Sequence, residues 1–448
     1  MLSCADFDPR RAADIFCPRR LTMSFEHPSR RKVLKTTMAL SNATSFGVST
    51  GRTEDRGATP LGRLDAVLRA ATEVRDAPGL VAVAATDKDI VYEGAFGARD
   101  LATGQAMTGD TVFRIASMTK AVTSTAAMQL VEQGKLKLED SVPDIDPALG
   151  APQVLAGFDA SGAPKLRAAN KPITLRHLLT HTAGFCYEVW DADMVRYVKA
   201  TGMPSTSTGK LASIRMPLIF EPGERWEYGV NTDWVGRIVE SISGKPLDAY
   251  FRDHIFGPLG MKDTDYVFSP QQQARLVSVH QRKGDGSLES QPQTSPITPE
   301  FRSGGGGLYS TASDYLTFTR MLLHGGSLNG TRILKPETVA LMNTNQIGDI
   351  EAGRLKTTTP ARSTDVDFFP GQSLKWGLGY MINAQQGPNG RSAGTVTWAG
   401  IFNTHYWIDP VRRVTGVIMM QVLPFGDPRA MKVYGQFERG VYDLLKSA

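Results

Sequence analysis

The chain has 448 residues, of which 41% are hydrophobic and 21% are charged, a composition typical of a globular protein large enough for two subdomains around a cleft. Most of its net charge of +5 lies in residues 1–56, where ten Lys and Arg stand against six Asp and Glu. The nearly neutral remainder predicts no nucleic-acid-binding surface, and the lack of any run of about 18 apolar residues predicts no membrane-spanning helix.

Residues 1–56 are predicted to be a leader or a disordered N-terminal segment. The stretch 29–35, Ser-Arg-Arg-Lys-Val-Leu-Lys, resembles the twin-arginine export signal, and a weakly apolar stretch follows at 36–48. Two localisations stay open, cytoplasmic, or periplasmic if this signal functions. Cys4 and Cys17 also lie in this segment, so Cys186 is the one cysteine of the remaining chain and no internal disulfide is expected there.

The predicted elements alternate between two kinds of structure along the chain. Apolar spacing predicts a helix over 61–74, strands over 80–84 and 90–95, and a helix over 117–133 that ends at Gly134. Helices then predominate, over 175–179, 231–242, 247–255 and 311–323. Strand patterns return at 376–382, 396–401, 404–408 and 414–421, before a final amphipathic helix with Tyr434, Phe437, Val441 and Leu444 on one face.

These elements predict an α/β (α+β) fold in which both ends of the chain build one sheet and a helical region is inserted between them. The polar segments 281–300 and 348–373 are long for internal connections, so we expect them to be surface or cleft-rim loops. The glycine run at 304–307 lacks the Lys-Ser or Lys-Thr of a phosphate loop and predicts a close backbone approach or a turn instead.

Ser117-Met118-Thr119-Lys120 opens the second predicted helix, where positions i and i+3 share a face. The serine hydroxyl then lies beside the lysine amine, and a serine is a good nucleophile only when a neighbour accepts its proton. Ser-x-x-Lys also occurs by chance at the start of a helix with a surface lysine. An apolar helix is a poor place for a merely solvated pair, which weighs against this alternative, but the four residues alone leave both interpretations open.

Three further segments follow in order, Ile-Thr-Leu-Arg-His-Leu-Leu-Thr-His-Thr-Ala-Gly at 173–184, Phe-Glu-Pro-Gly-Glu-Arg-Trp-Glu-Tyr at 220–228 and the Gly-rich stretch at 304–314. With the Ser-x-x-Lys they resemble the serine β-lactamase and penicillin-binding protein superfamily, class C β-lactamases among it, over nearly all of the chain after about residue 60. The stretch Trp398 to Pro410 is similar to the family VIII carboxylesterases.

The resemblance implies a β-lactamase-like fold, in which an antiparallel sheet is flanked by helices, a mainly helical subdomain is inserted, and the active site lies in the cleft between them. It implies a catalytic domain over 57–448. Within that domain we expect an α/β subdomain over about 57–118 plus 300–448 and a helical subdomain over about 119–299.

The resemblance also implies catalytic roles. Ser117 would attack the ester carbonyl, Lys120 would maintain the local field and transfer the proton, and Tyr228 would act as general base. Unperturbed tyrosine and lysine both have a pKa of about 10, so Tyr228 needs a neighbouring cation to act near neutral pH. The backbone N–H groups of Ser117 and Ile401 would form the oxyanion hole.

The third motif departs from the lactamase pattern, because the Lys-Thr-Gly expected there is Trp398-Ala399-Gly400. An indole replaces the cation that attracts the carboxylate of a lactam, which favours neutral acyl esters. The Tyr-x-Asn element also departs, since Asn231 comes one position late. We expect Trp398, Ala399, Gly400, Asn231 and His405 to bind substrate, with a buried core histidine as the alternative for His405.

Together these features predict a serine esterase, a carboxylesterase that cleaves short-chain esters through an acyl-enzyme on Ser117 without a cofactor, and weak β-lactamase activity is compatible with the same residues. A β-lactamase or D-alanyl peptidase-type amidase, and a catalytically silent ligand-binding relative, stay open as alternatives. The expected partner is a small-molecule ester; no nucleic acid or membrane partner is predicted, and the oligomeric state is open. His177 and His181 lack a further close ligand, so no metal site is predicted. Gly-x-Ser-x-Gly at 47–51 has polar flanks, which disfavours an α/β-hydrolase.

Overall fold

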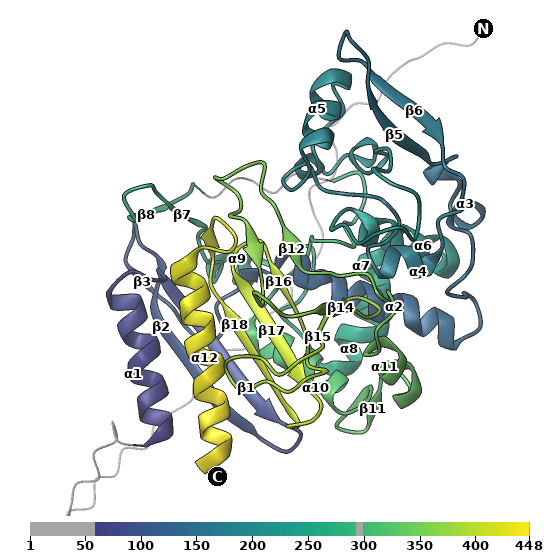
Figure 1. The fold of residues 1–448 in the computed structure, drawn as a ribbon. Helices are drawn as coiled ribbons and strands as arrows, with labels where there is room; N and C mark the ends of the chain where they lie inside the picture. Colours follow the sequence, from purple (N-terminus) through teal and green to yellow (C-terminus); the bar gives the residue numbers. More distant parts are fainter. Residues whose placement is uncertain (1–58, 293–298, 448) are drawn as a thin grey trace, which may run out of the picture. The chain divides into compact units, whose positions relative to one another are not determined.

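Both ends of the described chain contribute strands to one antiparallel sheet (Figure 1). The computed structural model describes residues 59–292 and 299–447, in which eight strands pair in the order β14-β15-β16-β17-β18-β1-β2-β3. Their bounds are Gly79–Thr86 (β1), Ile90–Asp100 (β2), Gln105–Ala106 (β3), Leu374–Trp376 (β14), Met381–Asn383 (β15), Val396–Gly400 (β16), Thr404–Asp409 (β17) and Val414–Met419 (β18). The prediction of a sheet built from both ends of the chain is confirmed.

Two predictions concern segments outside the described residues. The twin-arginine-like stretch 29–35 and the Gly-x-Ser-x-Gly stretch 47–51 both precede residue 59, where the description begins. Among the described helices, none combines the length and the apolar character that crossing a bilayer requires.

The prediction of one continuous strand over 376–382 is wrong, because the structure has a hairpin there. β14 and β15 pair with Trp376 opposite Met381, and the Gly377 N–H donates to the Tyr380 carbonyl at 2.9 Å. Gly379 has a φ of +117°, which side chains rarely adopt. A Cβ at Gly377 would meet the Met342 carbonyl oxygen at 2.1 Å. The glycines therefore turn the chain where the apolar pattern alone suggested a continuous strand.

Helices cover both faces of the sheet. On one face α1 (Pro60–Glu73) and α12 (Pro428–Ser447) lie side by side (Figure 1). Leu80, Ala82 and Ala84 of β1 belong to the apolar cluster under these two helices, whereas Val81 and Val83 belong to the cluster on the other face. On that other face α10 (Ala312–Leu323) packs on β1, β17 and β18. The alternation along β1 therefore separates two hydrophobic cores.

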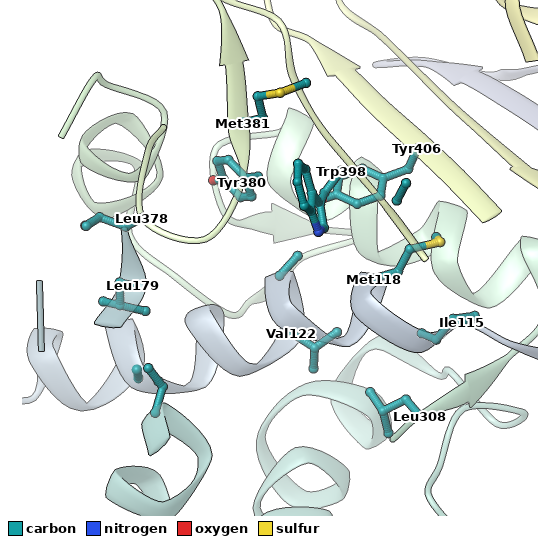
Figure 2. Packing of buried hydrophobic residues seen from close by; sticks show 14 of the residues in the cluster. Ile115, Met118, Val122, Leu179, Leu308, Leu378, Tyr380, Met381, Trp398 and Tyr406 are labelled. Atoms are coloured by element: carbon teal, nitrogen blue, oxygen red, sulfur yellow. The ribbon is translucent and has the colours of Figure 1, made fainter. Parts of the chain in front are cut away.

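Helix α2 (Thr119–Glu132) is buried along its length. It follows a 3-10 turn over Ala116–Met118, and Gly134 comes after its end with a φ of +69°. Figure 2 shows Met118 close to Tyr406 of β17, while Val122 lies on the side of α2 that faces away from Trp398 of β16. The neighbours of α2 on the helical side are α6 (Asn231–Ser243) and α7 (Leu247–Phe251). α2 thus lies between the sheet and the helical region, and the Ser-x-x-Lys pair lies at its start.

The region between residues 140 and 275 is mainly helical. It contains α3 (Val142–Ile145), α4 (Leu175–Leu179), α5 (Ala192–Thr201), α6 (Asn231–Ser243), α7 (Leu247–Phe251), a π-helical turn (Arg252–Phe256), α8 (Gly257–Leu259) and α9 (Pro270–Ala274), with 3-10 turns at Pro147–Leu149, Thr206–Thr208 and Leu211–Ile214. A hairpin of β5 (Gln153–Phe158) and β6 (Pro164–Ala168) interrupts it. The sequence patterns did not indicate this hairpin, whose strand β6 is largely exposed.

Short pairs complete the fold. They are β4 (Phe113–Arg114) with β9 (Tyr309–Ser310), β7 (His280–Arg282) with β8 (Leu288–Ser290) and β19 (Val422–Leu423), β10 (Ser327–Leu328) with β11 (Thr331–Arg332), and β12 (Arg354–Leu355) with β13 (Val366–Asp367); α11 spans Pro336–Met342. The β4–β9 pair matters for the site, because it brings the segment before Ser117 next to the glycine run at 304–307.

Candidate active site

Ser117 lies in the 3-10 turn that precedes α2 and lines a cavity of about 1160 Å³. The residue before it, Ala116, has a φ of +43°, a backbone conformation that costs an alanine about 1–3 kcal/mol and is typical of functional sites. Tyr315 donates to the Met118 carbonyl at 2.9 Å and helps to hold the turn. The nucleophile predicted from the sequence therefore reaches the cavity from a strained and well-anchored turn.

Lys120 is 1% exposed, and its ammonium group has three acceptors. Its Nζ lies 3.4 Å from Ser117 Oγ, 3.2 Å from the Tyr187 hydroxyl and 2.7 Å from the Gly305 carbonyl oxygen. Burial lowers the pKa of Lys120 to about 7, while the Asp233 carboxylate opposes this shift. Lys120 is therefore buried with hydrogen-bond partners, and one of them is Ser117, the predicted nucleophile.

Tyr228 is 2% exposed and completes the predicted group of three residues. Its hydroxyl is hydrogen-bonded with Ser117 and accepts the Trp398 indole N–H at 3.0 Å. Lys120 Nζ lies 4.7 Å from the centre of its ring. Burial raises the pKa of Tyr228, and the hydrogen bonds from Ser117 and Trp398 partly offset that rise. The structure thus brings Ser117, Lys120 and Tyr228 into mutual contact.

Trp398 is predicted to form a wall that faces the substrate, but the structure places it elsewhere. Its side chain on β16 is 2% exposed and is absent from the cavity lining. The ring packs at 4.8 Å from Tyr228 and 4.6 Å from Trp376, between ring centres. Because its N–H points to the Tyr228 hydroxyl, Trp398 contacts the predicted general base and does not face the cavity.

The end of β16 passes beside the turn that carries Ser117. A Cβ at Gly400 would meet the Ile115 carbonyl oxygen at 2.4 Å, so only glycine permits this approach. Ala399 is buried in the strand, whereas Ile401 directly after it lines the cavity together with Ser117. Ser117 and Ile401, which are expected to supply the oxyanion hole, thus lie on the wall of one cavity.

None of the five predicted substrate-binding residues lines the cavity: Asn231 and His405 lie outside it, as do Trp398, Ala399 and Gly400. Asn231 begins α6, is fully buried and lies 2.9 Å from His181 Nδ1 through its amide nitrogen. His405 is stacked on Tyr434, with 4.3 Å between ring centres, and burial lowers its pKa to about 3. Both side chains therefore pack in the core, and for His405 the structure has the alternative named above, a buried core histidine.

Sequence reasoning did not single out Tyr187 and Asp233, yet both line the cavity. The Tyr187 hydroxyl donates to Asp233 Oδ2 at 3.4 Å, and the Ser303 hydroxyl and the Gly305 N–H donate to Oδ1 at 2.6 and 3.0 Å. A Cβ at Gly305 would meet Asp233 Oδ2 at 2.6 Å. The glycine run is thus a close backbone approach, as predicted, and it approaches a carboxylate.

The cavity has both aromatic and polar walls. Its lining includes Arg114, Glu188, Trp190, Ser205, Thr206, Tyr266, Phe268, Phe301, Arg302, Tyr309, Arg362 and Phe402. Apart from Arg114 and Arg362, these residues come from the segments 187–190, 205–209, 266–273 and 299–309 and from the sheet end at 401–402. Ligand cavities in proteins commonly measure about 300–1000 Å³, so this one has room for a bulky substrate.

His177 and His181 have structural contacts. His177 Nδ1 accepts the Thr174 N–H at 3.2 Å and caps α4. His181 Nδ1 faces the Asn231 amide and the Gly229 N–H, and its pKa is well below the usual value because it is buried. Within residues 59–292 and 299–447, no group of three or more His, Cys, Asp and Glu side chains is placed to hold a metal ion.

A family model described as beta-lactamase matches residues 64–439 of this chain. The chain belongs to the β-lactamase family. The superfamily resemblance predicted from the motifs is therefore confirmed, and so is the β-lactamase-like fold. The unliganded simvastatin synthase from Aspergillus terreus superimposes on this β-lactamase-family chain with a TM-score of 0.75 at 29% identity, covering 87% of this chain and 100% of that one.

Curated relatives of this β-lactamase-family protein carry the names of acyl-transfer enzymes. Monacolin J acid methylbutanoyltransferase from Aspergillus terreus is 30% identical over 410 residues, which cover 86% of this chain and 96% of that protein. Lovastatin esterase from Penicillium rubens is 31% identical over 395 residues, which cover 85% of this chain and 98% of that protein. These similarities support an enzyme of the hydrolase and acyl-transfer type.

Proposed function

We propose that this protein is a carboxylesterase, similar to the family VIII enzymes, that hydrolyses carboxylic esters, short-chain ones included, through an acyl-enzyme on Ser117. The observation that carries the proposal is the contact of Ser117 with both Lys120 and Tyr228 beside a cavity that Ser117 lines. A nucleophile in contact with two groups that exchange protons fits acyl transfer and needs no cofactor. The name of the lovastatin esterase supports ester substrates.

In the first step, Ser117 Oγ bonds to the ester carbonyl carbon and its proton passes to the pair of Lys120 and Tyr228. The oxygen that becomes negative is stabilised by the backbone N–H groups of Ser117 and Ile401. The tetrahedral intermediate expels the alkoxide, which leaves as an alcohol with the proton held by the pair. Water then attacks the acyl-enzyme by the same route in reverse, which releases the acid and restores the Ser117 hydroxyl.

A second candidate function is transfer of the acyl group to an alcohol other than water. The size of the cavity supports it, because about 1160 Å³ accommodates an acyl chain and an acceptor together. The relatives named as methylbutanoyltransferases support the same reaction type. An acceptor alcohol would then replace water in the second step, with no change in the residues that exchange the proton.

The amidase alternative would require a positive charge at the position of Trp398. A β-lactamase of class C uses a lysine at the position of Trp398 to attract a carboxylate, and the indole here has no charge. Its N–H is also committed to the Tyr228 hydroxyl. We therefore rank the lactam reaction below ester cleavage.

The test is side-by-side turnover of a short-chain nitrophenyl ester and a chromogenic cephalosporin by wild type, Ser117→Ala and Tyr228→Phe. We expect each variant to lose at least about a thousandfold in kcat for the ester while its thermal melting stays close to wild type. Added short alcohols that increase nitrophenol release and form a new ester would support acyl transfer. Near-wild-type ester turnover by Ser117→Ala would refute the proposal, and faster cephalosporin cleavage would assign a β-lactamase.

A further inference from the structure

Lys120 carries three donors when it is protonated, and the structure supplies three acceptors for them. One acceptor is the nucleophile Ser117, and the other two are the Gly305 carbonyl and the Tyr187 hydroxyl. The shortest of the three distances, 2.7 Å, is to Gly305. A neutral amine has only two donors, so it could donate to only two of these three oxygens. The surroundings of Nζ are therefore built for the ammonium form.

The orientation of the Tyr187 hydroxyl follows from its second partner. Its proton goes to Asp233 Oδ2 at 3.4 Å, which leaves an oxygen lone pair to face Lys120 Nζ at 3.2 Å. Tyr187 keeps this proton near neutral pH, because burial and the nearby Asp233 raise its pKa well above the usual value. The Tyr187 hydroxyl thus links the Asp233 carboxylate to the Lys120 amine through two consecutive hydrogen bonds.

Asp233 is itself held in place on both sides. It is 4% exposed, and its Oδ1 accepts the Ser303 hydroxyl and the Gly305 N–H. Oδ2 is left for Tyr187. Gly305 therefore contacts both Asp233 and Lys120: its N–H donates to the Asp233 carboxylate, and its carbonyl accepts from the Lys120 amine.

The other ionisable groups that face Lys120 do not supply a competing charge. His181 is neutral, because burial and the nearby Lys120 hold its pKa well below the usual value. Tyr228 and Tyr187 are protonated phenols at rest. Asp233 on α6 is the carboxylate that favours the charged amine, against the burial that disfavours it.

We propose that Tyr187 and Asp233 are positioning residues of the acyl-transfer reaction, which hold Lys120 as a cation so that Tyr228 is the group of the pair that gives up its proton. The inference rests on the proposed function, since it assigns Tyr228 as the base within that mechanism. It explains how a buried phenol can act near neutral pH. A phenolate at Tyr228 has the Lys120 charge 4.7 Å from its ring centre and the Trp398 N–H on its oxygen.

The experiment compares Tyr187→Phe with Tyr266→Phe. Tyr266 is a matched control, because it also lines the cavity and donates to the same glycine-rich segment, at the Ser303 carbonyl, 2.7 Å away. The pH profile of kcat/KM for a nitrophenyl ester is measured for both variants and for wild type, with kcat and KM determined separately at the plateau. Labelling of Ser117 by a fluorophosphonate, followed at the same pH values, reports nucleophile activation without an ester substrate.

For Tyr187→Phe we expect the alkaline limb of the profile, where Lys120 loses its proton, to move about one unit to lower pH, because the ammonium loses a hydrogen-bond acceptor. We expect kcat to fall about tenfold with KM nearly unchanged, and Ser117 labelling to slow in parallel. Tyr266→Phe should keep the wild-type alkaline limb. Asp233→Asn, provided its melting transition is intact, should shift the limb in the same direction.

An unshifted alkaline limb in Tyr187→Phe, or a rise in KM with unchanged kcat, would overturn the inference and make Tyr187 a wall of the cavity. Equal effects of Tyr187→Phe and Tyr266→Phe would also overturn it, because they would indicate a role in holding the glycine-rich segment only. These outcomes differ from failure of the proposed function, in which wild type neither cleaves esters nor is labelled at Ser117.

Discussion

At the scale of single residues, Trp398 shows how a substitution can change the role of a position. A lysine there would present a charge to the substrate, but the indole is buried and donates to the Tyr228 hydroxyl. A hydrogen bond to a phenol oxygen stabilises the phenolate more than the neutral form, which lowers the pKa of Tyr228 against the effect of burial. Trp398 is thus placed to tune the base.

We predict that Trp398→Phe lowers kcat for a nitrophenyl ester about tenfold, because the loss of one hydrogen bond to the phenolate costs about 1.4 kcal/mol. KM should change little, since the ring does not line the cavity. Steady-state kinetics separate the two parameters. Trp376→Phe is the matched control, because its N–H donates to the Leu179 carbonyl at 3.1 Å in the same aromatic cluster. A change confined to KM would contradict this prediction and would support the sequence-based interpretation, in which the Trp398 ring contacts the substrate.

At the scale of elements, α12 is fastened to the loop between β15 and β16 by a buried ion pair. Arg391 and Glu438 are 0% and 1% exposed and are hydrogen-bonded to each other. Tyr434 accepts from the same guanidinium at 2.7 Å, and Asn389 donates to the other Glu438 oxygen at 2.9 Å. Because His405 stacks on Tyr434, this network lies directly behind the strand pair that leads to Ile401.

Glu438→Gln is expected to destabilise the protein by about 3–5 kcal/mol, because the Arg391 charge stays buried without a counter-ion. Urea denaturation followed by circular dichroism measures the change. Lys446→Gln on the same helix breaks the exposed pair with Asp443 and should alter stability by no more than about 0.5 kcal/mol. Equal stability of the two variants would show that the buried pair contributes nothing beyond a surface one.

At the scale of the whole molecule, several buried carboxyl groups make stability depend on pH. Burial raises the pKa of Glu227 to about 7, and the nearby Asp191 adds to this shift. The pKa of Asp314 rises to about 6 for the same main reason, burial. For a group whose pKa is higher in the folded state, the folded protein binds more protons between the two pKa values. Stability from these groups is therefore complete below their unfolded pKa values and is lost as pH rises through 6 and 7.

Glu227→Gln removes one of these groups and stays neutral at every pH. We therefore expect the variant to melt a few degrees above wild type at pH 8, where Glu227 is charged and partly buried, and at nearly the same temperature at pH 5. Differential scanning calorimetry at the two pH values measures this. Glu73→Gln at the exposed end of α1 is the control and should show the same difference from wild type at both pH values. A wild-type-like melting temperature of Glu227→Gln at pH 8 would contradict the prediction.

The sequence by itself determined the features that depend on local spacing. Helical periodicity placed Ser117 and Lys120 on one face, and the motif at 220–228 indicated Tyr228. Alternation and apolar runs predicted most strands of the sheet. The hairpin at Trp376–Met381 was not predicted, because its turn depends on the contact of a glycine with a distant carbonyl.

Only the tertiary structure decided the features that depend on contacts between distant segments. Tyr187 is 67 residues away from Lys120 in the sequence but contacts its amine. Asp233, on the separate helix α6, is linked to Lys120 through Tyr187. The direction of the Trp398 indole and the burial of Asn231 and His405 likewise follow from packing. A residue type fixes which hydrogen bonds a side chain can make, but the neighbours that the fold brings within 3 Å decide which of them it makes and how far its pKa shifts.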